Sequence, residues 1–221
     1  MARAEKETGR IEAFSDGVFA IAMTLLVLDL KVPRPSELPP AGGLSAALLA
    51  QWPTFLAYLN SFATILVMWV NHHVLFGHIK RTDQVFLFLN GLLLLFVTFV
   101  PYPTALLAAY FERPEAPLAA ALYAATFVVI AVAYNLLWWH ASAGHRLLDR
   151  HVDPAWVRGI TRQYWLGPPL YALAFVLAFI SVPASAGLCF LLALFFCFTG
   201  VLPELLARHR RRHQRGEEGW G

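Results

Sequence analysis

Six runs of roughly twenty mostly apolar residues divide this sequence, at residues 14–32, 53–76, 85–109, 116–139, 164–182 and 187–206. An α-helix of about that length crosses the ~30 Å hydrocarbon core of a bilayer. A segment in lipid must satisfy its own backbone hydrogen bonds, so the runs predict helices. With 58% hydrophobic and 14% charged residues, the chain has too little polar surface for a water-soluble globule. We therefore expect an all-α, polytopic membrane protein with six transmembrane helices.

Basic residues are distributed unevenly over the segments that connect these runs. Of the 17 Lys and Arg, fourteen lie before the first run, in the second and fourth loops, and after the sixth run. The other three are Lys31, at the end of the first run, and Arg34 and Arg113, in the alternate loops. The positive-inside rule then predicts that both termini are cytosolic. Basic residues spread over several loops, instead of one basic face, argue against a nucleic acid partner.

The sequence predicts one membrane domain, residues 1–209, followed by a basic cytosolic tail, residues 210–221. Five arginines between positions 208 and 215 are expected to contact anionic membrane lipids. No run repeats the sequence of the first, so the membrane domain is predicted to hold a single unit without an internal repeat. A symmetric pore would then require several copies of the chain.

Polar residues gather near the cytosolic ends of the first two runs. With both termini cytosolic, the start of the first run and the end of the second lie at similar depth, so their polar groups are able to pair, as apolar surroundings require. We predict an interhelical clamp formed by Arg10, Ser15, Asp16, Trp69, Asn71, His72 and His73. A second interpretation stays open, in which Asp16 is only a helix-start residue favoured by the helix dipole.

The same residues give little support for a catalytic or metal site. His72 and His73 point about 100° apart on a helix, and no nearby Cys or further His completes a ligand set. Cys189 and Cys197 lie inside the last run and are expected to pack as small apolar side chains. No nucleophile motif accompanies Asp16 and His72. We expect neither a cofactor nor enzymatic activity.

A separate face of the first run is apolar. At ~100° per residue, one stripe is shared by six residues, which are Phe14, Gly17, Ile21, Thr24, Leu25 and Leu28. Asp16 lies roughly 140° away from Ile21, so this first-helix stripe faces a different neighbour from the clamp. That neighbour is either lipid or another helix, as for most membrane helices, or the axis of a symmetric oligomer.

Arg10, Phe14, Ser15 and Asp16 form an Arg-x-x-x-Phe-Ser-Asp motif, and the chain thereby resembles the prokaryotic transmembrane protein 175 family, relatives of a lysosomal potassium channel. The resemblance continues through residues 17–33 and 69–73 and into the third run, at Asn90, Phe99 and residues 101–104, and it weakens over the last three runs. It implies a homotetrameric potassium channel in the plasma membrane of a bacterium, with first helices around the axis and K⁺ as the permeant ion.

The resemblance also implies pore residues. Ile21 would form the narrowest ring, followed outward by Thr24 or Leu25 and then Leu28, while the motif holds the pore helix against its neighbours. An apolar ring closes by dewetting, and K⁺ sheds water more readily than Na⁺, so modest K⁺ selectivity is expected. The Thr24 hydroxyl either replaces a water ligand or bonds to its own helix backbone. Met23 stands where the family commonly has β-branched residues, and it faces away from the axis.

An ion-coupled secondary transporter using Asp16 and His72/His73 is the alternative function. A carrier of that kind should have an ionisable residue deep in a span and helices broken near the midplane. Asp16 and Asp29 instead lie near the ends of the first run. The channel is therefore the favoured prediction.

Overall fold

The computed structural model describes residues 2–201, and side chains over residues 8–199. Its helices, in chain order, are α1 (Ala2–Leu25) with the 3₁₀ turn η1 (Leu26–Asp29), the 3₁₀ turn η2 (Pro35–Glu37), α2 (Gly43–Ala50), α3 (Trp52–His78), α4 (Gln84–Phe99), α5 (Pro101–Tyr110), α6 (Ala116–Ser142), the 3₁₀ turn η3 (Ala143–His145), α7 (Pro154–Ala178), α8 (Val182–Phe196) and the π-helical turn η4 (Cys197–Val201). The described part of the chain is all-helical, as predicted.

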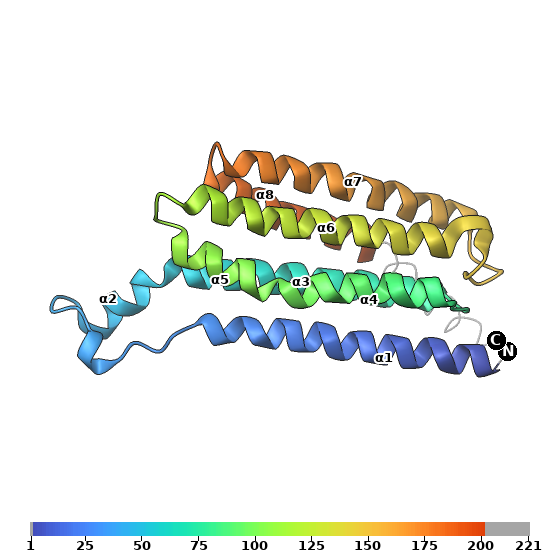
Figure 1. The fold of residues 1–221 in the computed structure, drawn as a ribbon, viewed down its shortest axis with the longest axis horizontal. Coiled ribbons are helices and arrows are strands. Elements are labelled where there is room, and N and C mark those ends of the chain that lie inside the picture. Colours follow the sequence, from blue (N-terminus) through green and yellow to red (C-terminus); the bar gives the residue numbers. More distant parts are fainter. Residues whose placement is uncertain (1, 202–221) are drawn as a thin grey trace, which may run out of the picture.

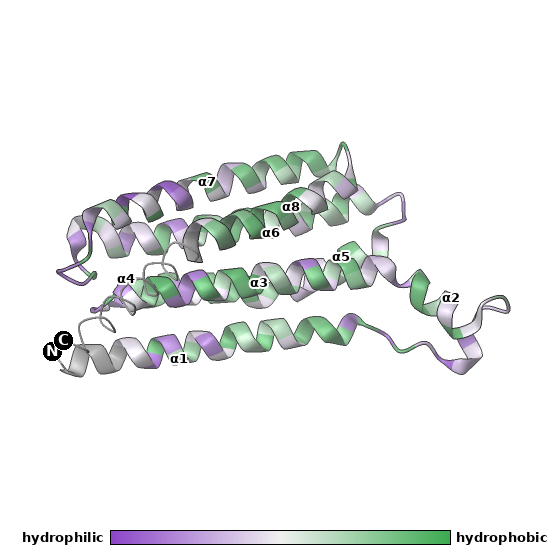
Figure 2. Ribbon diagram, turned by 180° about the vertical axis from the view of Figure 1, so that it is seen from behind, coloured by the Kyte–Doolittle hydropathy of each residue, from purple (hydrophilic) through white to green (hydrophobic). Residues whose placement is uncertain are grey.

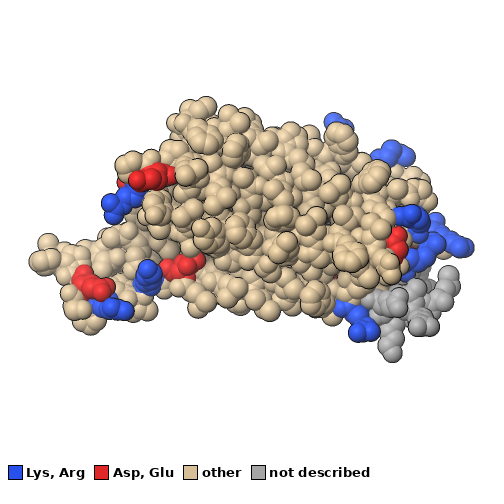
Figure 3. All heavy atoms as spheres, viewed as in Figure 1, with Lys and Arg blue, Asp and Glu red and all other residues tan. Residues whose placement is uncertain are grey.

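The long helices run side by side along the longest axis of the molecule (Figure 1). In that view α1 lies at one edge, α3 with α4 and α5 in the middle, and α6, α7 and α8 on the far side. Apolar residues fill the middle of the bundle, and polar residues collect toward its two ends (Figure 2). On the face shown in Figure 3, Lys and Arg gather at the end where α1 begins, and the broad belt between the two ends carries no charge.

Five helical segments of the described chain are long and apolar enough to cross a membrane, namely Thr8–Asp29, Trp52–His78, Gln84–Tyr110, Ala116–His145 and Val182–Thr199. They coincide with five of the six predicted runs. The remaining run, 164–182, falls mostly in α7, which begins ten residues earlier, at Pro154. The first half of α7 carries Arg158, Arg162 and Gln163, which lower its hydropathy. The bundle is therefore polytopic, with five clear spanning segments.

Proline accounts for two differences from the predicted boundaries. The first run was expected to extend to residue 32, but η1 ends at Asp29. Val32 directly precedes Pro33 and therefore avoids the α region, so the helix does not reach residue 32. Pro183 and Gly187 were expected to mark the turn before the last run, but both lie inside α8, where Pro183 occupies the first turn and needs no hydrogen-bond donor. The tail at 210–221 and the end of the last run lie outside the described residues.

Aspartate side chains cap the starts of α4 and α7. Asp83 Oδ1 accepts a hydrogen bond from the Phe86 backbone at 2.8 Å at the start of α4, and Asp153 Oδ1 accepts one from Ala155 at 2.8 Å at the start of α7. Such caps satisfy backbone donors that have no partner within the helix. The third predicted run is interrupted at Val100, between α4 and α5, where Pro101 and Pro103 remove backbone donors.

The core lies around α6, and α1 is peripheral. In the most apolar stretch of α6, 61% of the residues are buried, whereas the corresponding share for α1 is 22%. α1 packs against α3 and α4 along one side only. Most of its surface is therefore left to lipid or to other molecules.

Candidate pore helix and its polar network

Two opposite faces of α1 have different surroundings. Ser15, Phe19, Ala22 and Leu26 are fully buried against the bundle, and they follow one another at intervals of three or four residues. Every member of the first-helix stripe is exposed, with 57% of Ile21 and 72% of Leu28 accessible. A helix in water would not present such a face, and in a membrane it must meet lipid or protein.

A carboxylate joins α1 to α3. Trp69 Nε1 donates a hydrogen bond of 2.8 Å to Asp16 Oδ1. Figure 1 shows the start of α1 and the end of α3 at the same end of the bundle, so the two side chains meet at similar depth. The alternative interpretation, that Asp16 is only a helix-start residue, is wrong, because α1 begins at Ala2 and Asp16 lies well inside it.

A second connection runs through three buried side chains. His72 Nε2 donates to Asn90 Oδ1 at 2.9 Å, Asn90 Nδ2 donates to Ser15 Oγ at 3.0 Å, and Ser15 Oγ donates to the backbone oxygen of Ile11 at 2.9 Å. The chain of bonds thus links α3 and α4 to α1. Among the described residues, His72 Nδ1 is buried without a partner, and the Asn90 oxygen, which only accepts, places the ring proton on Nε2.

A third connection lies nearer the end of the bundle. His73 Nδ1 is 2.9 Å from Glu12 Oε1, and both side chains are partly exposed. Glu12 and Asn90 were not among the predicted clamp residues. Glu12 precedes Asp16 by four residues and so shares its helix face, and Asn90 is a polar side chain within an apolar run, which needs a partner. Both signals were present in the sequence.

Two residues predicted to join the clamp lie elsewhere. Asn71 Nδ2 donates to the backbone oxygen of Val67 in its own helix, at 2.9 Å, and the side chain lines a cavity on the far side of α3. At ~100° per residue, Asn71 stands about 200° from Trp69, whereas His73 returns to within about 40° of it. Arg10 is exposed and lines an open hollow between α1 and α4 with Phe14 and Asp83.

The positions of the Thr24 and Met23 side chains on α1 differ. Thr24 Oγ1 donates to the backbone oxygen of Ile21 at 2.9 Å, so its proton is engaged within α1, while the oxygen keeps accepting capacity on the exposed face. Met23 is half-buried and packs against the core of the bundle, away from the first-helix stripe.

Asp83 connects the start of α4 to the end of α6. Besides capping α4, its carboxylate accepts from His140 Nε2 at 2.9 Å and lies 3.4 Å from Arg146 Nη2. The backbone N–H of Phe86, followed by the contact with His140, holds the pKa of this carboxyl below its usual value. Within the described residues, no group of three or more His, Cys, Asp or Glu lies close enough to hold a metal ion.

A bundle of helices with five apolar spanning segments in its described part defines a multi-pass membrane protein. Residues 10–101 match the sequence profile of a family described as Endosomal/lysosomal potassium channel TMEM175. A potassium channel of Chamaesiphon minutus is 56% identical over 192 residues, which cover 87% of this chain and 94% of that protein. The chain belongs to the TMEM175 family, a family of channels and not of enzymes, which confirms the resemblance drawn from its first helix.

A solved structure and a more distant relative complete the comparison. The crystal structure of a lysosomal potassium-selective channel TMEM175 homolog from Chamaesiphon minutus matches with a TM-score of 0.81 at 53% identity, covering 89% of this chain and 100% of that one. The human endosomal/lysosomal proton channel TMEM175 is 38% identical over 142 residues, which are 62% of this chain and 28% of the human protein. The names of these relatives therefore give different ions, potassium for the bacterial proteins and the proton for the human one.

Proposed function

We propose that this chain forms a homotetrameric potassium channel of a bacterial plasma membrane, with four α1 helices around the pore. The observation that carries the proposal is the first-helix stripe, an apolar face of α1 that the rest of the subunit leaves uncovered. Four copies arranged about an axis would cover such a face with itself. The similarity to a potassium channel over most of both chains supports K⁺ as the ion.

Ile21 forms the narrowest ring of the proposed pore, followed by Thr24 or Leu25 and then Leu28. The ring closes by dewetting, and a wider state passes a partly hydrated ion, with modest preference for K⁺ over Na⁺. The exposed position of these side chains supports the assignment. The bonds of Asp16 and Ser15 to α3 and α4 support a structural role for the Arg-Phe-Ser-Asp motif, which holds α1 in place.

The proposed topology has six crossings, with α7 as the fifth and both termini in the cytosol. α7 has 25 residues and is about 37 Å long, enough for the ~30 Å hydrocarbon core. Arg158 and Arg162 lie one turn apart near its start, where long basic side chains reach the headgroups, and Leu173 and Val176 are exposed further along. The gathering of Lys and Arg at one end supports this orientation (Figure 3).

The proposal is tested by flux in liposomes that contain the purified protein. A K⁺ gradient should drive flux that exceeds Na⁺ flux, and Ile21→Asn should raise flux or reduce the preference for K⁺, because a polar ring no longer dewets. Leu173→Asn is the matched control, an equally exposed leucine on α7 that should leave flux unchanged. Coupled, saturable transport that depends on Asp16 would favour the carrier, and equal effects of both variants would contradict the pore assignment.

A further inference from the structure

One side of α7 is exposed from its first turns to its last. At ~100° per residue, an arc of about 100° contains the exposed residues Arg158, Arg162, Trp165, Leu166, Pro169, Leu173 and Val176, which we call the α7 stripe. The buried residues of α7 all lie on the opposite side of the helix. α7 therefore packs against the bundle with one side and leaves the α7 stripe uncovered.

Charge divides the α7 stripe into two parts. Arg158 and Arg162 lie one turn apart, and neither side chain forms an ion pair or a hydrogen bond within the described residues. α7 carries no acidic residue to pair with them, and beyond Arg162 the stripe has no charge. Counted back from Ala178, where α7 ends, the ~30 Å hydrocarbon core takes up about twenty residues and so reaches Arg158. The two arginines therefore lie at the depth of the lipid headgroups.

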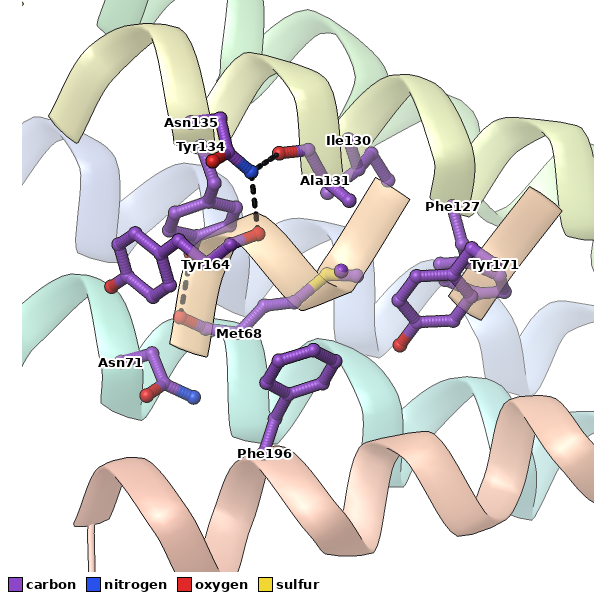
Figure 4. Close-up of a pocket in the computed structure, with 11 residues that line it drawn as sticks. Met68, Asn71, Phe127, Ile130, Ala131, Tyr134, Asn135, Tyr164, Tyr171 and Phe196 are labelled. Atoms are coloured by element: carbon purple, nitrogen blue, oxygen red, sulfur yellow. Dashed lines mark hydrogen bonds between the residues drawn. The ribbon is translucent and has the colours of Figure 1, made fainter. Parts of the chain in front are cut away.

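Contacts on the buried side hold α7 in this rotation. Pro168 lacks the backbone N–H that would bond to the Tyr164 oxygen, and Asn135 Nδ2 of α6 donates to that oxygen instead, at 2.7 Å (Figure 4). Trp138 Nε1, also of α6, donates to Thr161 Oγ1 at 2.8 Å. The two arginines thus extend from a helix that is already fixed, which lowers the entropic cost of binding a ligand.

The α7 stripe also lies away from the proposed pore. In Figure 1, α1 is at one edge of the bundle, and α7 is on the far side, beyond the layer of α3, α4 and α5. A tetramer that forms through α1 would therefore leave the α7 stripe facing lipid.

We propose that the α7 stripe binds one anionic phospholipid of the cytosolic leaflet, with its phosphate on Arg158 and Arg162 and an acyl chain along Trp165, Leu173 and Val176. This inference rests on the proposed topology, in which α7 is the fifth crossing and begins in the cytosol. A guanidinium binds phosphate oxygens through two parallel N–H groups. Two arginines without an acidic partner favour a headgroup of net negative charge. The apolar part of the stripe favours a lipid over free phosphate.

The test uses phosphatidylglycerol with a photoreactive diazirine in one acyl chain, as a trace component of phosphatidylcholine liposomes that contain the purified full-length chain. Peptide mass spectrometry should place more label on α7, near Leu173 and Val176, than on α8 at the equally exposed Leu191. Unlabelled phosphatidylglycerol should remove this excess, and glycerol phosphate should not. In the Arg158→Gln, Arg162→Gln double variant the α7-to-α8 label ratio should fall at least about fivefold, which corresponds to about 1 kcal/mol, the contribution of one basic side chain beside an anionic surface.

Two further double variants separate the site from folding and from the general charge of this end. Arg158→Lys, Arg162→Lys keeps both charges and should retain most of the excess label. Lys80→Gln, Arg81→Gln removes the same charge from the exposed α3–α4 loop, which meets the α6–α7 loop where Lys80 N donates to the Leu147 oxygen, and it should leave the ratio nearly unchanged.

Three outcomes would overturn the proposal. They are equal labelling of α7 and α8 in the parent, competition by glycerol phosphate, and equal losses in the two glutamine double variants. Labelling does not depend on ion flux, and cysteine labelling tests the topology separately. A failure of the lipid site is therefore distinguishable from a failure of the proposed channel function.

Discussion

At the scale of the residue, helix rotation decides which polar groups meet. Trp69, His72 and His73 face α1 and α4, whereas Asn71, between them in sequence, faces the cavity bounded by α6, α7 and α8. The ends of the apolar runs predicted the depth of each residue in the membrane, and they placed Asp16 and Trp69 at the same depth. Asn90, from a third helix, completes the contacts by accepting from His72 and donating to Ser15.

Removing the Trp69 donor should destabilise the protein. Trp69→Phe keeps the ring but leaves the half-buried Asp16 oxygen without its bond, which is expected to cost about 1–3 kcal/mol. Thermal unfolding in detergent measures the effect as a lower Tm. Trp165→Phe is the control, because Trp165 is 74% exposed and forms no hydrogen bond within the described residues. Equal Tm values for the two variants would show that the Asp16 contact contributes nothing.

At the scale of the element, side chains satisfy backbone groups at helix starts and at one proline site. Asp83 caps α4 and bonds to His140 at the end of α6, and Asn135 of α6 bonds to the Tyr164 oxygen of α7. The loops that follow α3 and α6 also pair, with Lys80 N donating to the Leu147 oxygen at 3.0 Å. α6 is therefore connected to its neighbours through specific bonds as well as apolar packing.

Substitutions of Asp83 should separate its cap from its ion pairs. Asparagine caps nearly as well as aspartate, so Asp83→Asn should lose only the contacts with His140 and Arg146. Asp83→Ala also loses the cap, so its free energy of unfolding should be lower by about 1 kcal/mol more. At Asp153, which caps α7, the asparagine variant should match the parent and only the alanine variant should be less stable. Thermal unfolding of the four variants at pH 7 makes the comparison.

The Asp83 contribution should also depend on pH. Its pKa is lowered in the folded protein, so the carboxylate stabilises the fold above its ordinary pKa of about 4, and the contribution is lost as the pH falls through the folded value. The stability difference between parent and Asp83→Asn should thus shrink on acidification below about pH 4. A constant difference from pH 7 to pH 3 would contradict the ion-pair contribution.

The hydrogen bond from Asn135 to the Tyr164 backbone oxygen predicts that one proline substitution restores stability lost by an Asn135 variant. Asn135→Leu should lower the free energy of unfolding by about 1–3 kcal/mol, because the Tyr164 backbone oxygen is left without a donor. In a Pro168→Ala background the helix N–H returns to that oxygen, and the cost should fall. Pro169→Ala instead returns a donor to the Trp165 oxygen, so it should give no rescue. A double-mutant cycle from thermal unfolding tests this, and identical costs in both backgrounds would contradict the assignment.

At the scale of the whole molecule, the exposed apolar surface and the charged residues lie on different parts of the bundle. The bundle is closed around α6, while α1 lies at the edge (Figure 1) and leaves an apolar face uncovered. Charged residues lie at the two ends (Figure 3). Together they favour a multi-pass protein that crosses the bilayer along its long axis, and the proposed tetramer would form through the open α1 side.

The proposed orientation is tested by labelling single cysteines in intact cells. In a chain with Cys189→Ala and Cys197→Ala, a membrane-impermeant maleimide should label Glu37→Cys, in the loop after the first span, and spare Arg150→Cys until the cells are lysed. The reverse pattern would place the termini outside. Labelling of both positions in intact cells would contradict an even number of crossings between the N-terminus and Arg150.

The sequence by itself determined the all-helical class, five spanning segments and the family, because run length and a contiguous motif are local properties that need no knowledge of neighbours. It also showed that one face of the first helix is apolar. Only the tertiary structure decided that this face stays uncovered, that Asn71 and Arg10 lie outside the clamp, and that Asn135 replaces the donor missing at Pro168. These outcomes depend on the rotation and pairing of helices far apart in sequence, which packing of the whole bundle sets.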